Sequence, residues 1–248
     1  MKSVIVAAIL AAAFAAGATA AEIKVMSAGA VEPGLMRAVE AFKKASGTDV
    51  KVQFNTAPQL AKKLADGEVA DVLVAPPGLL DEQTKAEKAS ADGRVALGRV
   101  GAGVLVRSDA SPPNIATTEA LKQALLSADS IVYNKASSGQ YIAKMIDKLG
   151  IADQVKSKTT LYPDANAVVE HVAKGKGNEI GFSPIPEIKQ SEHKGVKLVG
   201  PLPADIQNYT SYGAAQLTGA TSKDAAKAFL AFLATPESRQ AFASAGIE

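Results

Sequence analysis

Two serines and a glycine, Ser137, Ser138 and Gly139, directly precede an amphipathic run and could bind an anion. The apolar residues of this run repeat at helical spacing and end before Gly150, so we expect a helix that begins near Gly139. The first turn of a helix has backbone N–H groups without partners and the positive end of the helix dipole. Hydroxyl side chains at such a position either cap the helix or help to hold an anion. The residues alone leave both roles open.

Four further short polar turns, at residues 26–30, 54–58, 162–167 and 182–186, follow strand-like segments. In open parallel sheets the carboxyl ends of the strands and the starts of the following helices meet at one crevice, where small ligands bind. Each turn offers a hydroxyl group, an amide, or small residues that let the backbone approach a ligand. We therefore predict a single binding cleft. Its predicted ligand-binding residues are Ser27, Ala28, Gly29, Ala30, Thr56, Ala57, Ser137, Ser138, Gly139, Asn166 and Ser183.

Catalytic and metal-binding arrangements have weaker support. A serine nucleophile needs a neighbouring base, and both histidines, His171 and His193, lie far in sequence from the polar turns, at positions predicted to be on the surface. Asp71 and Asp164 could form an acid–base pair, but each lies where a turn or capping role is usual. We expect no catalytic residues, no metal site and no cofactor, and hence a protein that is not an enzyme.

The elements that must position these turns alternate between strands and helices. Strand-like segments at 22–28, 49–54 and 70–76 are separated by helical ones, which implies right-handed parallel crossovers. After a glycine-rich extended segment at 93–114 the same pattern restarts, and the chain ends in two helices joined at Pro236.

We therefore predict an α/β fold with two lobes, each a mainly parallel sheet flanked by helices. Lobe 1 would comprise residues 21–103 and 212–248, and lobe 2 residues 104–211. The chain should cross between the lobes near residues 99–107 and again near 203–213.

The first 20 residues have the form of a secretory signal peptide: a basic start at Lys2, an apolar centre, and small residues at Ala18 and Ala20. We expect export to a bacterial periplasm, which agrees with a chain that contains no cysteine. The formal net charge of +2, with both signs interspersed, gives no basic patch for nucleic acid.

Three longer segments carry a resemblance to a known family. Residues 54–76, 137–150 and, most specifically, the closing helices at 225–246 resemble periplasmic solute-binding proteins of ABC transporters, in the molybdate-binding branch of the type II fold. The resemblance implies a monomer that closes two lobes around a small anionic ligand. It also implies a partner, the transporter's permease in the inner membrane.

The oxyanion-binding positions of that branch are only partly matched. Its first serine falls on Ala30, its second on Ala57, and its tyrosine on Pro184, so three hydrogen-bonding side chains are absent at the matched positions. The turn at Ser137 and Ser138 replaces a Pro-Ala-Gly turn. The ligand could be molybdate, another oxyanion or an organic acid. A hydrolase or dehydratase on the same fold, or a surface or signalling co-receptor, are the alternatives.

The predicted signal peptide has a direct test. Cleavage after Ala20 or Ala21 should give a mature protein that begins at Ala21 or Glu22. Amino-terminal sequencing of periplasmic material should show this start. A chain that retains Lys2 in the membrane fraction would contradict export by cleavage.

Overall fold

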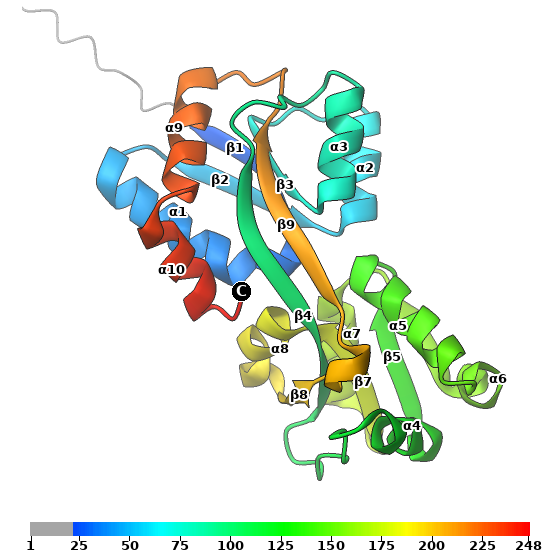
Figure 1. Ribbon diagram of the computed structural model, residues 1–248. Helices are drawn as coiled ribbons and strands as arrows, with labels where there is room; N and C mark the ends of the chain where they lie inside the picture. Colours follow the sequence, from blue (N-terminus) through cyan, green and yellow to red (C-terminus); the bar gives the residue numbers. More distant parts are fainter. Residues whose placement is uncertain (1–21) are drawn as a thin grey trace, which may run out of the picture.

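The computed structural model describes residues 22–248, which form a mixed α/β fold around one curled sheet (Figure 1). The predicted signal peptide at 1–20 lies outside the described residues. The strands follow the order β2-β1-β3-β9-β4-β7-β5-β6, and β8 pairs with β4. They are β1 (Ile23–Ala28), β2 (Val50–Asn55), β3 (Val72–Ala75), β4 (Val95–Arg107), β5 (Ser130–Asn134), β6 (Thr159–Tyr162), β7 (Glu179–Pro184), β8 (Val196–Pro201) and β9 (Tyr209–Gln216).

The helices flank this sheet and mostly follow directly on a strand, as the alternating sequence pattern predicts. Side-chain oxygens of Thr117, Asp164 and Thr235 accept hydrogen bonds at the starts of α4, α7 and α10, which is ordinary N-capping. Three helices, α3, α6 and α8, are additions that the sequence analysis did not predict. The helices are α1 (Glu32–Ser46), α2 (Ala57–Ala65), α3 (Pro77–Lys85), α4 (Thr118–Ser127), α5 (Ser137–Lys148), α6 (Ala152–Val155), α7 (Ala165–Lys174), α8 (Ile185–Gln190), α9 (Lys223–Leu233) and α10 (Pro236–Ser244).

The sheet is parallel at its two ends and antiparallel in its middle. The strands β2, β1 and β3 pair in parallel, and so do β6, β5 and β7. The prediction of mainly parallel sheets is wrong for β4, β8 and β9, which pair antiparallel to their neighbours. The reason lies in the connections, because β4 leads from one parallel group to the other and β9 leads back, so these two strands run in opposite directions.

Strand β4 belongs to both parts of the sheet. Residues 95–101 of β4 pair with β9, and residues 102–107 pair with β7 and β8. The predicted crossings at 99–107 and 203–213 therefore fall on β4 and on the segment that leads into β9. The sheet continues through this strand, so the division into lobes at 103/104 and 211/212 stays a prediction.

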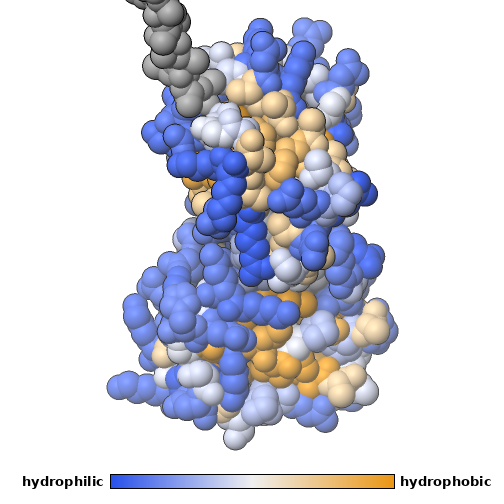
Figure 2. Space-filling view, turned by 90° about the vertical axis from the view of Figure 1, so that its left-hand side faces the viewer, coloured by the Kyte–Doolittle hydropathy of each residue, from blue (hydrophilic) through white to orange (hydrophobic). Residues whose placement is uncertain are grey.

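The apolar core is divided along the sheet at the same place. The largest cluster of buried side chains combines residues from 23–100 with residues from 212–247, and includes the edge-to-face pair of Phe42 and Phe229, 5.1 Å between ring centres. Two other clusters come from residues 102–202. In Figure 2 the outline of the molecule narrows at mid-height, between the parts that hold these two sets.

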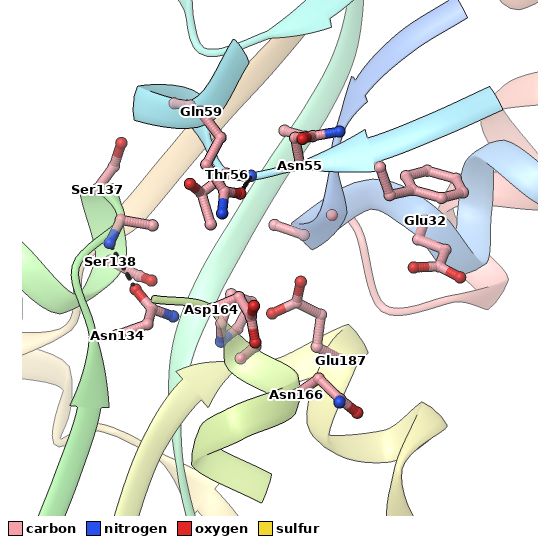
Figure 3. Close-up of a pocket in the computed structure, with 18 of the residues that line it drawn as sticks. Glu32, Asn55, Thr56, Gln59, Asn134, Ser137, Ser138, Asp164, Asn166 and Glu187 are labelled. Atoms are coloured by element: carbon pink, nitrogen blue, oxygen red, sulfur yellow. Dashed lines mark hydrogen bonds between the residues drawn. The ribbon is translucent and has the colours of Figure 1, made fainter. Parts of the chain in front are cut away.

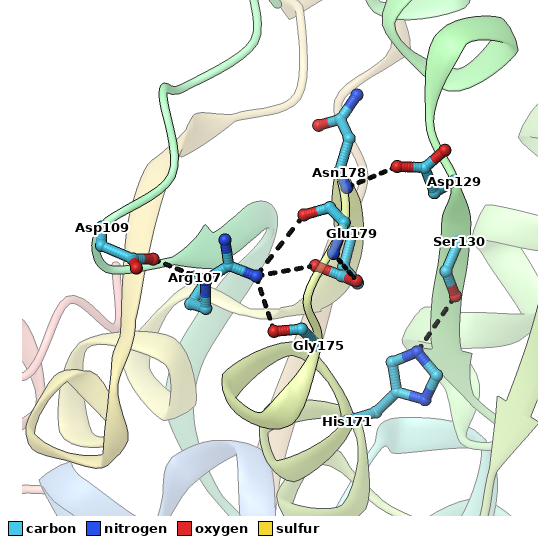
Figure 4. A network of polar contacts seen from close by, with 9 residues as sticks. Arg107, Asp109, Asp129, Ser130, His171, Gly175, Asn178 and Glu179 are labelled. Atoms are coloured by element: carbon cyan, nitrogen blue, oxygen red, sulfur yellow. Dashed lines mark hydrogen bonds and ion pairs between the residues drawn. The ribbon is translucent and has the colours of Figure 1, made fainter.

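A polar network at the end of β4 holds the part of the sheet remote from the polar turns (Figure 4). Arg107 forms an ion pair with the buried Glu179, 3.3 Å from Nη1 to Oε2, and donates a hydrogen bond to the Gly175 carbonyl oxygen. His171, predicted to be a surface residue, is instead half-buried, because its ring nitrogens hydrogen-bond to the hydroxyl groups of Ser130 and Tyr162. His193 is exposed, as predicted.

Asp71 at the start of β3 joins three segments. Its carboxylate is buried and accepts hydrogen bonds from the backbone N–H groups of Lys24, Thr221 and Ser222, at 2.7–2.9 Å. Burial alone would raise the pKa of this carboxyl, but the N–H groups outweigh it and hold the pKa below its usual value of 3.8. This is the structural role that the sequence favoured for Asp71.

Replacing this carboxylate should destabilise the fold. Asp71→Asn should lower the free energy of unfolding by about 2 kcal/mol at pH 7, since hydrogen bonds to a charged group are worth about 1.5–3 kcal/mol. The folded pKa lies below the unfolded one, so this stability is present above about pH 4 and should vanish as pH falls through the folded pKa. Denaturant unfolding at pH 7 and pH 3 measures both.

The matched control is Asp81→Asn, which removes a surface ion pair with Arg94. It should change the free energy of unfolding by at most about 1 kcal/mol. Equal losses in the two variants would contradict the role assigned to Asp71.

Candidate functional site

A cavity of about 220 Å³ lies where the carboxyl ends of five strands meet. The residues that follow β1, β2, β5, β6 and β7 line it, together with the starts of α2, α5 and α7. Figure 3 shows these loops facing one another from opposite sides of the space. Eight of the eleven predicted site residues line it: Ala28, Gly29, Ala30, Thr56, Ala57, Ser137, Ser138 and Asn166.

The other three predicted residues do not line the cavity. Ser27 is fully buried in β1, and its hydroxyl group donates to the Ala28 carbonyl oxygen at 3.1 Å. Ser183 is buried in β7, and its hydroxyl oxygen has no hydrogen-bond partner among residues 22–248. Gly139 serves packing, because a Cβ atom there would lie 1.6 Å from the Asn134 carbonyl oxygen. Only glycine lets α5 approach the end of β5 this closely.

The hydrogen bonds at the start of α5 show whether Ser137 and Ser138 cap this helix. The N-cap residue of this helix is Ala136, and no side chain caps it. Asn134 organises the turn instead, since its Oδ1 atom accepts a hydrogen bond from the Ala136 N–H at 2.9 Å. Within residues 22–248 neither serine hydroxyl serves as a cap of α5, and both residues line the cavity.

The neighbouring turns are closed by their own local hydrogen bonds. The Thr56 N–H donates to Gln59 Oε1 at 2.8 Å, which fixes the first turn of α2. Asp164 caps α7, as the sequence favoured, by accepting from the Ala167 N–H at 2.9 Å. The amide group of Asn166 is engaged away from the cavity, because Glu170 accepts from its Nδ2 atom and Lys194 donates to its Oδ1 atom.

The charged groups of the cavity are all acidic. Glu32, Asp164 and Glu187 line it, and no lysine, arginine or histidine side chain among the described residues does so. Figure 3 shows Glu187 pointing from α8 into the cavity, on the side of Asp164. Its enclosure by protein and the charges of Glu32 and Asp164 raise the pKa of Glu187 to about 8. Most of this carboxyl is therefore neutral at pH 7 and can donate a hydrogen bond.

Two residues adjoin Glu187 across the cavity. A Cβ atom on Gly29 would lie 2.9 Å from Glu187 Oε1, so the glycine lets the carboxyl lie against the turn that follows β1. Tyr212 on β9 also lines the cavity, and burial together with the charge of Glu187 raises its pKa above the usual value of 10.0. The tyrosine hydroxyl thus stays protonated and can donate.

The sequence analysis missed Glu187, Asn134, Tyr212 and Glu32. In the sequence, only the position of Glu187 three residues after Pro184, in a polar turn, pointed to it. Glutamates are common in such turns, so this position did not mark Glu187 as a site residue.

Within residues 22–248, no group of three His, Asp or Glu side chains is arranged to hold a metal ion. No helix of that part of the chain has the length and apolar character needed to cross a membrane.

The sequence matches a known family and resembles one characterised enzyme. A family model described as bacterial extracellular solute-binding protein matches residues 23–248. The chain is 28% identical over 234 residues to the aconitate isomerase of a Pseudomonas species, and this match covers 91% of the chain and 87% of that protein.

The fold resembles solved structures of two anion-binding proteins. The periplasmic molybdate-binding protein of Azotobacter vinelandii has a TM-score of 0.76 and 16% identity, over 91% of this chain and 98% of that one. The sulfate-binding protein SubI of Mycobacterium tuberculosis H37Rv has a TM-score of 0.72 and 19% identity, over 91% and 86%. These likenesses confirm the predicted resemblance in fold.

The raised pKa of Glu187 predicts a measurable effect on stability. Because the folded pKa of about 8 exceeds the usual 4.5, the folded protein keeps a proton that the unfolded chain loses between these values. The free energy of unfolding should therefore fall as pH rises from 5 to 8, by at most about 1.4 kcal/mol per pH unit. Glu187→Gln should remove this fall, which denaturant unfolding of both proteins at pH 5, 6, 7 and 8 measures.

The control variant is Glu192→Gln, since Glu192 is exposed and outside the cavity. It should keep the pH dependence of the unaltered protein. The same pH dependence in Glu187→Gln and in the unaltered protein would show that Glu187 ionises as an ordinary surface carboxyl.

Proposed function

The chain belongs to the family of bacterial extracellular solute-binding proteins, and from that premise we propose that it captures a small organic acid anion in the cavity at the strand ends. In this proposal the protein works in the periplasm as a monomer. It delivers the bound anion to the permease of an ABC transporter in the inner membrane.

The donor set of the cavity is the observation that carries the proposal. The first residues of α2, α5 and α7 line it, and the starts of helices carry partial positive charge and N–H groups that favour anions. Ser137 and Ser138 also line the cavity, and neither side chain caps a helix. An anion would thus be held by neutral donors and not by a side-chain cation.

The size of the cavity favours an organic acid over a tetrahedral oxyanion. The cavity has a volume of about 220 Å³, which is the space of about seven water molecules at about 30 Å³ each. A tetrahedral oxyanion has only four oxygen atoms around its central atom, so it would fill the cavity less completely than a larger organic acid. Hydroxyl groups are also absent at Ala30, Ala57 and Pro184, where molybdate binders of this branch have them. The likeness to an enzyme that acts on an organic acid supports the same choice.

Closure of two lobes would complete the site. Residues 21–103 and 212–248 would form one lobe and residues 104–211 the other, with the hinge at β4 and at the segment before β9. The change of partners between Gly101 and Ala102 supports this hinge, since β4 pairs with β9 before it and with β7 and β8 after it. Hinge closure of this kind buries a ligand between two sets of helix starts.

A second candidate function is isomerisation of an unsaturated organic acid, in place of the hydrolase or dehydratase considered from the sequence. Moving a double bond in such an acid transfers a proton between carbon atoms, and a general acid–base group works best with a pKa near the operating pH. Glu187 is such a group inside the cavity. The similarity to an aconitate isomerase favours this candidate over other chemistry.

Calorimetric titration with citrate, trans-aconitate, molybdate and sulfate tests the proposal. A tricarboxylate should bind more tightly than molybdate. Ser138→Ala should weaken binding about 10- to 150-fold, because a hydrogen bond to a charged group is worth about 1.5–3 kcal/mol. The same variant should change the free energy of unfolding by less than about 0.5 kcal/mol, since the hydroxyl caps nothing.

Ser127→Ala is the matched control, because that hydroxyl group bonds to carbonyl oxygens within α4. It should leave the dissociation constant unchanged. Binding of molybdate without any carboxylate would contradict the proposed ligand class. Proton NMR of the trans-aconitate mixture decides the second candidate, which requires the cis isomer to accumulate.

A further inference from the structure

We propose that Glu187 is a specificity-determining residue of this cavity: it is a neutral carboxyl group in the complex, donates a hydrogen bond to the bound anion, and so couples capture of the anion to uptake of a proton wherever the free protein has lost that proton. This inference rests on the proposed function, because it requires an anionic solute. It deepens that function by naming the side chain that discriminates between solutes by their charge.

The position of Glu187 is fixed by the chain around it. Helix α8 follows β7 directly, with Pro184 before its first residue and Pro186 in its first turn. Its carboxyl lies against Gly29, in the turn after β1, so it spans from one group of parallel strands to the other. A ligand held by Ser137 and Ser138 shares the cavity with this carboxyl.

The groups that face Glu187 are acidic or neutral. Glu32 at the start of α1 and Asp164 at the start of α7 contribute negative charge, and Tyr212 on β9 contributes a hydroxyl group. Ionised Glu187 would therefore place a further negative charge beside these two and beside the bound anion. In its neutral form it contributes an O–H donor instead.

The cations on the elements around α8 are directed elsewhere. Arg37 on α1 donates to Ser244, Arg99 on β4 pairs with Glu248, Arg107 on β4 pairs with Glu179, and Lys194 donates to Asn166.

The remaining charged groups of the elements packed around α8 line no part of the cavity. They are Glu40, Lys43 and Lys44 on α1, Lys189 on α8, Glu192 and His193 after it, and Lys197 on β8.

Anion binding and ionisation of Glu187 thus oppose each other, and each must weaken the other by the same factor. The neutral carboxyl favours a fully ionised oxygen of the solute, which can only accept a hydrogen bond. It disfavours a cation, for which a carboxylate would be the better partner. The residue therefore selects for solute charge as well as for shape.

Calorimetric titrations of the four probe anions named above, from pH 7 to pH 9.5, test this coupling. The dissociation constant should rise about 10-fold between pH 7 and pH 9, because one proton must be regained above a pKa near 8. Comparison of buffers with different heats of ionisation at pH 9 should show uptake of close to one proton per bound anion.

Three variants separate Glu187 from other causes. Glu187→Gln keeps a hydrogen-bond donor without a titrating proton, so it should bind at pH 9 as it does at pH 7. Glu32→Gln should keep the pH dependence but move its midpoint to lower pH, because a charge that raises the pKa of Glu187 is removed. The exposed control Glu192→Gln should behave as the unaltered protein does.

The outcomes distinguish this inference from the proposed function. Tight binding that is independent of pH, or a pH dependence that survives in Glu187→Gln, would overturn the role of Glu187 while leaving solute capture intact. Failure of all four anions to bind at any pH would overturn the proposed function, and this inference with it.

Discussion

The site depends on one constraint: five strands end at the same place, and the helices that follow them begin there. A helix start leaves N–H groups unpartnered, so their convergence creates a region that favours negative charge. At the start of α7, Asp164 accepts a hydrogen bond from one such N–H group. The side chains of Asn134 and Gln59 accept hydrogen bonds from the N–H groups just before α5 and α2. The first residues of α2, α5 and α7 line the cavity, which places three helix starts around one space.

The electrostatic behaviour of the cavity follows from the same arrangement. In the proposed function the cavity holds an anion through helix starts and hydroxyl groups, and among residues 22–248 no side-chain cation lines it that would keep Glu187 ionised. The rest of the chain keeps this space intact from a distance. Asp71 ties β3 to the start of α9, and Arg107 with Glu179 secures the far end of β4. The apolar core is divided into a part formed by residues from 23–100 and 212–247 and a part formed by residues from 102–202, and β4 runs through both.

Local features of the site were predictable from the sequence, and features that depend on distant residues were not. The turns at Gly29, Thr56 and Ser138 were predicted because a strand, a small polar turn and a helix succeed one another within a few residues. Ser27 and Ser183 were expected at the cavity but do not line it, since period-2 alternation cannot decide which face of a fully buried strand meets a cavity. Gly139 was read as a ligand contact because its closeness to the Asn134 carbonyl oxygen exists only once α5 packs on β5.

Glu187 was missed for the same physical reason. Its unusual ionisation arises from Glu32 and Asp164, which are distant in sequence, and from enclosure by both parts of the sheet. The antiparallel pairing of β4 with β9 likewise joins residues more than 100 positions apart, which no local pattern reports.

The most direct test of this account is a ¹³C NMR titration of the glutamate side-chain carboxyl carbons, with the Glu187 resonance assigned by its loss in Glu187→Gln. Enclosure by protein beside Glu32 and Asp164, with no cation of residues 22–248 lining the cavity, predicts a midpoint near pH 8 for this carbon. A midpoint near 4.5, the usual value for glutamate, would contradict it.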